Sequence, residues 1–217
     1  MNSEELKQWR KATRNELLAR RAAVPVPLHR ERNEIMTTRL VSGFPMLSRM
    51  IVSFYWPFQG EFDPRFAIRP FREGGATAAL PVVVEKRAPL QFREWWPGVA
   101  TTKGVFDLPV PEGTRVVVPE ALLIPPVGFD ARGYRLGYGG GYFDHTLAMI
   151  TPQPLKIGVA FELSRLETIY PQPYDIPLDF IVTERCIYHN AQGGLEPLAT
   201  AGRAAELAAQ LLASRHP

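Results

Sequence analysis

The fold is decided by residues 121–150, which read ALLIPPVGFD ARGYRLGYGG GYFDHTLAMI. The apolar run at 121–125 is typical of a buried strand that enters a loop. Closely spaced glycines at 137–141 then lead into a helix expected over about 141–150, because tight turns favour residues without a Cβ. A strand, a glycine-rich loop and a helix in this order predict an α/β fold.

The same alternation extends in both directions along the chain. Helices are expected over 3–22, 29–42 and 201–214 and in a short segment after Asp63-Pro64, whereas strands are expected over 50–56, 79–84, 88–92, 156–161 and 180–183. A chain of 217 residues with no internal repeat and no convincing boundary favours one domain. The sequence therefore predicts a single α/β domain over residues 1–217.

Composition excludes several classes of protein. Hydrophobic residues make up 46% and charged residues 22% of the chain, which excludes a mostly disordered protein. No apolar run approaches the roughly 20 residues of a membrane helix, and the opening Met-Asn-Ser-Glu-Glu does not resemble a signal peptide. Cys186 is the sole cysteine, which suits the reducing cytoplasm and excludes metal motifs built on several cysteines.

The basic charge of the chain is concentrated in one segment. The sequence pI is 9.1, yet residues 1–49 contain ten Lys and Arg against five Glu, a balance of +5, so the remaining residues carry −2. Aromatic residues do not interleave with these cations, as they do in proteins that bind single-stranded nucleic acid. We therefore expect no nucleic-acid partner.

Residues 3–22 are expected to form a helix that carries part of this charge. Ser3 is its predicted N-cap, and Pro25 and Pro27 lie beyond its end. A buried stripe is predicted from the spacing of Leu6, Trp9, Thr13, Leu17 and Arg20. Arg10 and Arg14 lie one turn apart with Lys11 beside them, so the three cations repel one another unless an anion lies among them. A solvated basic face is the alternative.

The glycine-rich loop has the features of a phosphate site. Glycines 137, 139, 140 and 141 run into a helix, whose first N–H groups attract anions. Arg135 can bind a phosphate with two parallel hydrogen bonds, and Asp144 is a hard oxygen ligand suited to Mg²⁺ beside a phosphate. A glycine-rich hairpin without a ligand is the alternative. Neither the dinucleotide fingerprint nor the P-loop is present.

Trp56 and Glu61 form a second candidate site at the end of the predicted strand 50–56. Loops that follow such strands are where α/β folds bind ligands. An aromatic ring and a nearby carboxylate suit a flat heterocycle with ring N–H groups. The alternatives are a core Trp with a surface Glu, or a Glu61 that caps the helix beginning near Pro64.

Residues 128–144 resemble the 5-formyltetrahydrofolate cyclo-ligase family, also called methenyltetrahydrofolate synthetase. The resemblance is carried by Gly-Phe-Asp-x-x-Gly-x-Arg-Leu-Gly-x-Gly-x-Gly-Tyr-x-Asp, and weaker matches extend over about 8–185, with 186–217 as a C-terminal tail that contains a helix. It implies a single α/β domain with a central, largely parallel sheet flanked by helices. It also implies an ATP- and Mg²⁺-dependent ligase that converts 5-formyltetrahydrofolate to 5,10-methenyltetrahydrofolate and releases ADP and phosphate.

The resemblance also implies a set of site residues. ATP is assigned to Arg10, Lys11, Arg14, Arg135, Gly137, Gly139, Gly140, Gly141, Tyr142 and Phe143. Folate is assigned to Trp56, Glu61, Tyr138 and Tyr142, the metal to Asp144 and Asp175, and the catalytic roles to Arg135 and Tyr142. We expect a cytoplasmic monomer whose partners are ATP and a reduced folate, without a membrane partner.

Four positions depart from the family pattern. Arg10 occupies the family's opening Lys position, with Lys11 adjacent. Val110 stands where the family usually has a carboxylate, His145 takes the place of the usual basic residue after the metal-binding Asp, and Tyr174 replaces the usual His. Val110 and His145 leave open a non-catalytic or regulatory relative that binds nucleotide or folate without turnover. A sugar-phosphate or acyl-group enzyme of similar architecture is a further alternative, because a fold does not fix a function.

Overall fold

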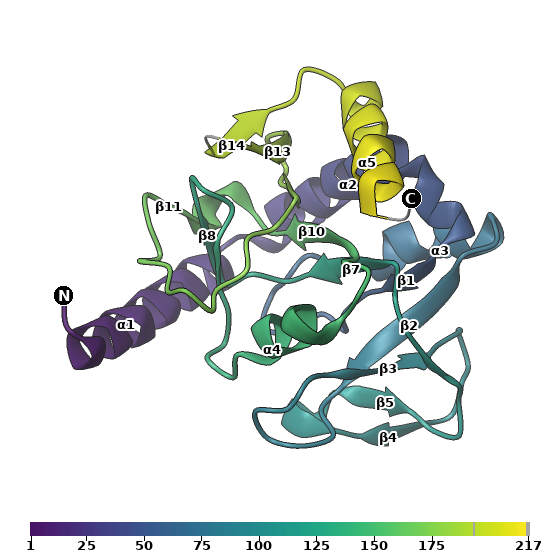
Figure 1. Ribbon diagram of the computed structural model, residues 1–217, viewed down its shortest axis with the longest axis horizontal. Helices are drawn as coiled ribbons and strands as arrows, with labels where there is room; N and C mark the ends of the chain where they lie inside the picture. The colour runs from purple at the N-terminus through teal and green to yellow at the C-terminus, as the bar shows by residue number, and fades with distance from the viewer. Residues whose placement is uncertain (193, 216–217) are drawn as a thin grey trace.

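The computed structural model describes residues 1–192 and 194–215, apart from the Phe106 side chain, and its centre is a nine-stranded sheet (Figure 1). The five central strands are parallel, in the order β12 (Phe180–Val182), β10 (Leu155–Val159), β7 (Ala121–Ile124), β1 (Ile51–Ser53) and β2 (Thr77–Val82). Antiparallel strands extend both edges: β3 (Gln91–Glu94) and β6 (Val116–Val117) beyond β2, and β13 (Ile187–Ala191) and β14 (Gly194–Pro197) beyond β12. The predicted α/β class with a largely parallel central sheet is confirmed.

Helices cover both faces of this sheet. The core on one face contains residues of α2 (Val26–Gly43), α3 (Arg65–Glu73) and α5 (Ala201–Arg215), and the core on the other contains Leu147 of α4 (Tyr142–Met149). Side chains alternate along each strand, so that Leu123 of β7 enters the first core and Leu122 enters the second. This two-sided burial explains why the central strands are almost continuously apolar.

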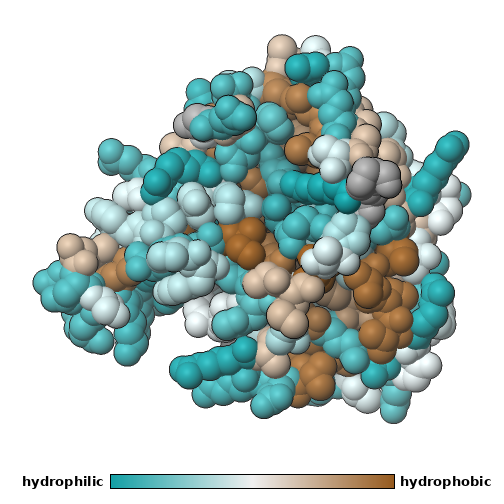
Figure 2. Space-filling view, in the orientation of Figure 1, coloured by the Kyte–Doolittle hydropathy of each residue, from teal (hydrophilic) through white to brown (hydrophobic). Residues whose placement is uncertain are grey.

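Helix α1 (Ser3–Ala22) projects to one side of the sheet (Figure 1) and packs on a separate small cluster. That cluster contains Leu17, Val127, Leu136 and Ile169. In Figure 2 the end formed by α1 is mostly hydrophilic, whereas hydrophobic residues gather around the sheet edge that carries β2 and β3. Helix α1 thereby brings its basic residues against the loops at the carboxyl side of the sheet.

Several short elements were not expected from the sequence. They are a three-stranded sheet of β8 (Gly128–Asp130), β9 (Arg135–Leu136) and β11 (Arg165–Leu166), a hairpin of β4 (Thr101–Lys103) and β5 (Pro109–Pro111), and three 3-10 helices, η1 (Pro45–Arg49), η2 (Val105–Asp107) and η3 (Glu162–Ser164). Strands of two or three residues are too short to show an alternating pattern.

The structure confirms the bounds of the predicted helix 3–22 and corrects its N-cap and the start of the next helix. The N-cap of α1 is Asn2, not Ser3, because Asn2 Oδ1 accepts the Glu5 N–H at 2.9 Å and Glu5 Oε2 accepts the Asn2 N–H at 2.8 Å. Helix α2 begins at Val26 instead of 29, since Pro27 occupies a first-turn position that needs no N–H donor. The face of α1 that is buried carries Arg21, not Arg20.

Strand boundaries also differ from the prediction. Strand β1 ends at Ser53 although the apolar run continues to 56, because the chain leaves the sheet there for a loop that lines the site. Strand β3 covers 91–94 instead of 88–92. Within the described ranges, no helix is long and apolar enough to cross a membrane.

Candidate active site

A cavity of about 860 Å³ lies at the carboxyl ends of β1, β2 and β7, where α/β folds commonly bind ligands. Its volume is within the usual range for small-molecule sites. Most of its polar side chains come from four segments: α1, the loop 55–61 after β1, the glycine-rich loop 137–141 with the start of α4, and the segment 173–176. Apolar residues within 80–90, 105–110 and 124–125 complete its walls. The structure therefore brings both candidate sites of the sequence into one cavity.

The glycine-rich loop adopts a backbone that side chains would disturb. Gly139 and Gly141 have φ angles of +101° and +69°, in the region that favours glycine. A Cβ at Gly140 would lie 2.5 Å from the Tyr142 ring, whereas a Cβ at Gly137 would meet nothing within 4 Å. Gly141 is the N-cap of α4 and, as a glycine, has no side chain that could accept hydrogen bonds from the first N–H groups of the helix. The start of α4 consequently presents backbone N–H groups at the cavity wall.

Arg14 is a half-buried cation beside this loop. Its Nε donates to the Gly137 carbonyl oxygen at 2.7 Å, and its guanidinium carbon lies 3.5 Å from the position of a Cβ on Gly139. Burial, and then the charge of Arg10, lower the pKa of Arg14. Among the described residues no acidic side chain pairs with Arg14. A positive charge without a counter-charge therefore lines the cavity next to the glycines.

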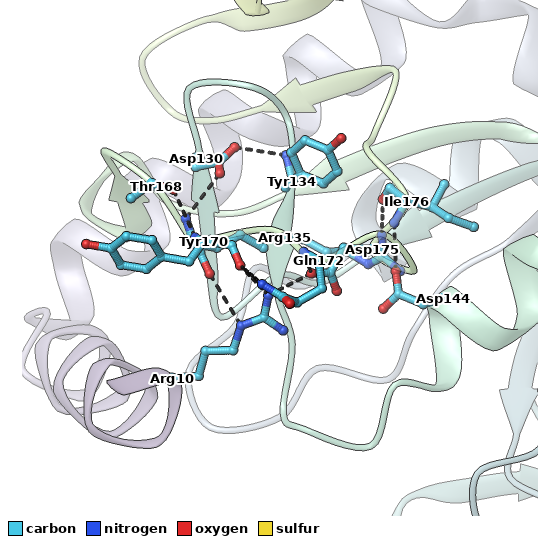
Figure 3. Close-up of polar contacts among 11 residues, drawn as sticks. Arg10, Asp130, Tyr134, Arg135, Asp144, Thr168, Tyr170, Gln172, Asp175 and Ile176 are labelled. Atoms are coloured by element: carbon cyan, nitrogen blue, oxygen red, sulfur yellow. Dashed lines mark hydrogen bonds and ion pairs between the residues drawn. The ribbon is translucent and has the colours of Figure 1, made fainter. Parts of the chain in front are cut away.

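The other two cations of the predicted cluster are placed differently. Arg10 donates to Asp175 Oδ2 at 2.6 Å and to the carbonyl oxygens of Ile169 and Tyr170 at 3.3 and 3.1 Å, so it anchors the loop that leads to segment 173–176 (Figure 3). Lys11 is exposed and is not among the residues that line the cavity. Arg14 is therefore the member of the cluster that lines the cavity and has no acidic partner in the described part of the chain.

Arg135 is committed to protein contacts. Its guanidinium donates to the Ile176 carbonyl oxygen at 2.6 Å and to Asp144 Oδ1 at 2.8 Å (Figure 3). Burial lowers the pKa of Arg135, and the charges of Asp144 and Asp175 oppose this shift. Asp144 Oδ1 also accepts the Ile176 N–H at 3.0 Å. Arg135 consequently fixes Asp144 against segment 173–176 and retains unused donors for a ligand.

The residues proposed for the metal fit a Mg²⁺ ion that shares its coordination with phosphates. Asp144 and Asp175 both line the cavity, and among the described residues Asp144 Oδ2 and Asp175 Oδ1 make no hydrogen bond. No three His, Cys, Asp or Glu side chains in the described ranges form a metal-binding group. Two carboxylates completed by phosphate oxygens and water are the usual environment of Mg²⁺ in nucleotide sites.

Glu61 is buried at another part of the cavity wall. Tyr138 donates its hydroxyl to Glu61 Oε1 at 2.6 Å, and the Phe58 N–H donates to Glu61 Oε2 at 2.9 Å. The side chain is only 4% exposed, and burial raises its pKa to about 7 although the Tyr138 hydrogen bond and Arg21 lower it. Its low exposure means that Glu61 is not a surface residue. Glu61 is also not the cap of α3, because Asp63 accepts the Arg65 N–H at the start of that helix.

Trp56 lines the same part of the cavity and is half-buried. The Arg65 guanidinium lies 4.5 Å above its ring, and the Trp95 ring meets it edge-on at 6.2 Å. These contacts hold the indole ring next to the loop that carries Glu61. Tyr138 completes this part, its ring 6.1 Å from that of Phe58.

Two residues of the site, Arg21 and Asp130, were not assigned a role from the sequence. Arg21 contacts both Glu61 and Tyr138. The sequence pattern that could have identified Arg21 is its spacing of four from Leu17 and seven from Arg14, which puts the three residues on one helix face. Asp130 is fully buried and accepts N–H groups of Arg132, Tyr134 and Ile169, so it shapes the β8–β9 hairpin that delivers Arg135. The departures Val110, His145 and Tyr174 all line the cavity.

The chain is similar to proteins of one family along most of its length. The 5-formyltetrahydrofolate cyclo-ligase family matches residues 6–184. The 5-formyltetrahydrofolate cyclo-ligase of Escherichia coli (strain K12) is 30% identical over 173 residues, which cover 76% of this chain and 94% of that protein. The solved structure of Aquifex aeolicus 5,10-methenyltetrahydrofolate synthetase superposes with a TM-score of 0.73 at 26% identity, covering 88% of this chain and 96% of that one. A 5,10-methenyltetrahydrofolate synthetase from Mycoplasma pneumoniae shares the fold, with a TM-score of 0.65 at 23% identity over 80% of this chain and 97% of that one.

Proposed function

Because the chain belongs to the 5-formyltetrahydrofolate cyclo-ligase family, we propose that it converts 5-formyltetrahydrofolate to 5,10-methenyltetrahydrofolate with ATP and Mg²⁺, releasing ADP and phosphate. The chain is thus a ligase. One observation supports the nucleotide and folate assignments together: a cation without an acidic partner among the described residues, Arg14, and a buried carboxylate, Glu61, line the same cavity.

The triphosphate of ATP is assigned to the glycine-rich loop. The loop N–H groups and Arg14 supply hydrogen bonds and positive charge to the phosphates, and Arg14 is held beside the loop by its hydrogen bond to the Gly137 carbonyl oxygen. Tyr142 and Phe143 begin the helix at this point and line the cavity. Asp144 and Asp175 would hold Mg²⁺, which when bound neutralises charge on the phosphates.

The reduced pterin of the folate is assigned to Trp56, Glu61 and Tyr138. A pterin is flat and carries N–H donors, so an aromatic surface and a carboxylate acceptor suit it. An ionised carboxylate can accept about four hydrogen bonds, and Tyr138 and Phe58 fill two of these positions on Glu61. The remaining lone pairs are available to pterin N–H groups.

The reaction joins the two ends of the cavity. The formyl oxygen of the folate attacks the γ-phosphorus, the bond to ADP breaks, and the formyl carbon becomes an iminium-like phosphate ester. The N10 amine then attacks this carbon, the C–O bond breaks, and phosphate leaves with the N10 proton. Arg14, Arg135 and the loop N–H groups stabilise the negative charge that moves in both steps.

The apolar wall of the cavity protects the activated intermediate from water. It is formed by Val83, Val105, Leu108, Val110 and Ile124. Exclusion of water prevents hydrolysis of the phosphorylated species before N10 attacks. We also propose a cytoplasmic monomer, since one chain supplies both ends of the site and its sole cysteine suits a reducing compartment.

The experiment mixes the purified chain with Mg-ATP and 5-formyltetrahydrofolate and follows the absorbance of the methenyl product together with ADP and phosphate. Equal amounts of the three products are expected, and none of them when ATP is left out. Calorimetric titration with each substrate separates the alternative of a regulatory relative, which would bind without turnover. Absence of product in the presence of binding would establish that alternative and overturn the proposal.

A further inference from the structure

Arg21 is a buried arginine that joins three segments of the site. It comes from the last turn of α1, and its side chain is 4% exposed. Its Nε donates to the Gln59 carbonyl oxygen at 3.0 Å, and its terminal nitrogen donates to the Tyr138 hydroxyl at 2.7 Å. The same nitrogen lies 3.8 Å from Glu61 Oε1. One guanidinium therefore links α1, the loop 55–61 and the glycine-rich loop.

Burial of this cation is costly unless its charge is compensated. Within the described ranges, Glu61 is the acidic side chain paired with Arg21. Apolar residues in place of a buried ion pair would often make a protein more stable. Stability alone therefore does not explain why Arg21 is buried here. Its contacts with Glu61 and Tyr138, which are both assigned to the folate, point to a role in the site.

Arg21 also holds the turn that presents Glu61. Gln59 and Gly60 have φ angles of +49° and +73°, so this turn places a non-glycine residue in the left-handed region. The Gln59 carbonyl oxygen is held by Arg21, and the Gly60 carbonyl oxygen lies 3.0 Å from His29 Nε2. The turn that carries Glu61 is thus held by Arg21 of α1 and by His29 of α2.

We propose that Arg21 is the positioning residue of the folate end: it places a positive charge beside the Glu61 carboxylate, directs the Tyr138 hydroxyl toward that carboxylate and fixes the loop 55–61. The inference rests on the proposed function, because it takes Glu61 as the acceptor of pterin N–H groups.

The groups around Glu61 define the expected pH dependence. Arg21 and Tyr138 lower the pKa of Glu61 against the larger effect of burial, which leaves it at about 7. Tyr55, a further titratable neighbour of Glu61, stays protonated, because burial raises its pKa and the charges of Glu61 and Asp63 raise it further. Without the guanidinium, one of the interactions that lower the pKa of Glu61 is lost, so its pKa rises further and Glu61 is protonated up to a higher pH. The acid side of the pH profile of kcat/KM should therefore move to higher pH.

The experiment compares Arg21→Met with Arg20→Met, a matched control on the exposed side of the same helix that loses a surface pair with Glu16. Steady-state kinetics from about pH 6 to 9 give kcat and the KM of each substrate. For Arg21→Met we expect the folate KM to rise at least tenfold, consistent with loss of a charge-assisted contact, and the acid limb to move upward. The ATP KM should change by less than about threefold. Arg20→Met should match the unaltered chain.

Arg21→Lys tests the role of geometry. It keeps the charge but cannot contact the Gln59 carbonyl and Tyr138 hydroxyl as a planar fork, so the acid limb should return toward its original position while the folate KM stays raised. An Arg21→Met protein with unchanged folate KM and pH profile overturns the inference. If that variant does not fold, an unchanged folate KM in Arg21→Lys overturns it. Absence of turnover in the unaltered chain instead contradicts the proposed function.

Discussion

The charge of Glu61 is the property of a single side chain that decides how the folate end binds. Glu61→Gln keeps the shape of the side chain and removes the charged acceptor. Folate affinity should fall by about 1.5–3 kcal/mol, whereas ATP affinity should stay unchanged because the triphosphate is assigned to Arg14 and the glycine-rich loop. Calorimetric titration of the variant with each substrate checks both values. An unchanged folate affinity would remove Glu61 from the folate site.

The same substitution has the opposite effect on stability. The folded protein raises the pKa of Glu61 from 4.5 to about 7, so this carboxyl contributes stability below about pH 4.5 that is lost as the pH rises through 7. Gln does not ionise, so Glu61→Gln should be more stable than the unaltered chain at about pH 8, by roughly 1–3 kcal/mol. The difference should nearly vanish at about pH 4, where Glu61 is mostly protonated in both the folded and the unfolded chain. Thermal unfolding at both pH values measures it, and a lower Tm at pH 8 would contradict the prediction.

Asp144 is expected to act through charge. Asp144→Asn keeps an acceptor for the Ile176 N–H but loses the charge that pairs with Arg135 and would hold Mg²⁺, so kcat should fall by orders of magnitude. Asp175→Asn should lower kcat less. Turnover is measured against Mg²⁺ concentration, with Tm as the control for folding. Full Mg²⁺-dependent turnover in Asp144→Asn would show that the residue is structural.

The sequence was sufficient to assign a role in the site to residues whose type is unusual for the place they occupy in a helix or strand. Glycines before a helix and a carboxylate after a buried strand led to the loop and to Glu61, and both line the cavity. Arg20 was placed on the buried stripe in place of Arg21, because both lie within one turn of Leu17. The spacing of four and seven that puts Arg21 on one face with Leu17 and Arg14 was the signal that favoured Arg21. Lys11 was grouped with Arg10 and Arg14 by spacing, yet one position along a helix turns the side chain by about 100°.

At the scale of elements, the glycine-rich loop is the part where backbone shape and proposed function coincide. Gly139→Val would place a branched residue at a φ of +101° and near the Arg14 guanidinium, and Gly140→Val would meet the Tyr142 ring. Both variants should lose measurable ATP binding while the protein stays folded. Gly202→Val in α5 is the matched control, since a Cβ there meets no tight contact. Titration with ATP and circular dichroism decide, and normal ATP affinity in either loop variant would contradict the assignment.

The long elements of the fold could be predicted, whereas the short ones could not. Helix α1 and the parallel strands follow from periodic or continuous apolar residues and from prolines at their ends. The β8–β9 hairpin depends on buried Asp130 and on Gly133 at a φ of +78°, which are tertiary features. Strand β1 ends before its apolar run does, because the residues after Ser53 are used by the cavity and the core.

At the scale of the whole molecule, the segment beyond the family match is part of the domain. The match ends at 184, yet β13 and β14 extend the sheet and α5 packs on α2 and contributes Ala204 and Ala208 to the core. The end of α5 is fixed by Arg215, which donates to both Asp179 oxygens at 2.7 and 2.9 Å and to the Pro154 carbonyl oxygen.

The ion pair between half-buried Arg215 and buried Asp179 should support stability without affecting the site. Asp179 also binds Lys156, with Nζ 3.2 Å from Oδ1, so removal of Arg215 does not leave an isolated charge. Arg215→Met should therefore cost only about 1–3 kcal/mol, a decrease of several degrees in Tm for a chain of this size. Lys156 and Asp179 lie at the amino ends of β10 and β12, whereas the cavity lies at the carboxyl ends of the neighbouring strands. Folate and ATP affinities should accordingly stay unchanged.

The control for this prediction is Arg203→Met, on the same helix. Arg203 pairs with Glu206 across an exposed turn, and such surface pairs contribute less than about 1 kcal/mol. Thermal unfolding and calorimetric titration of both variants separate the outcomes. A Tm for Arg215→Met equal to that of Arg203→Met would mean that α5 is held by its apolar face alone. Weakened substrate binding in Arg215→Met would mean that the two ends of the sheet are coupled, because the substitution removes no group that lines the cavity.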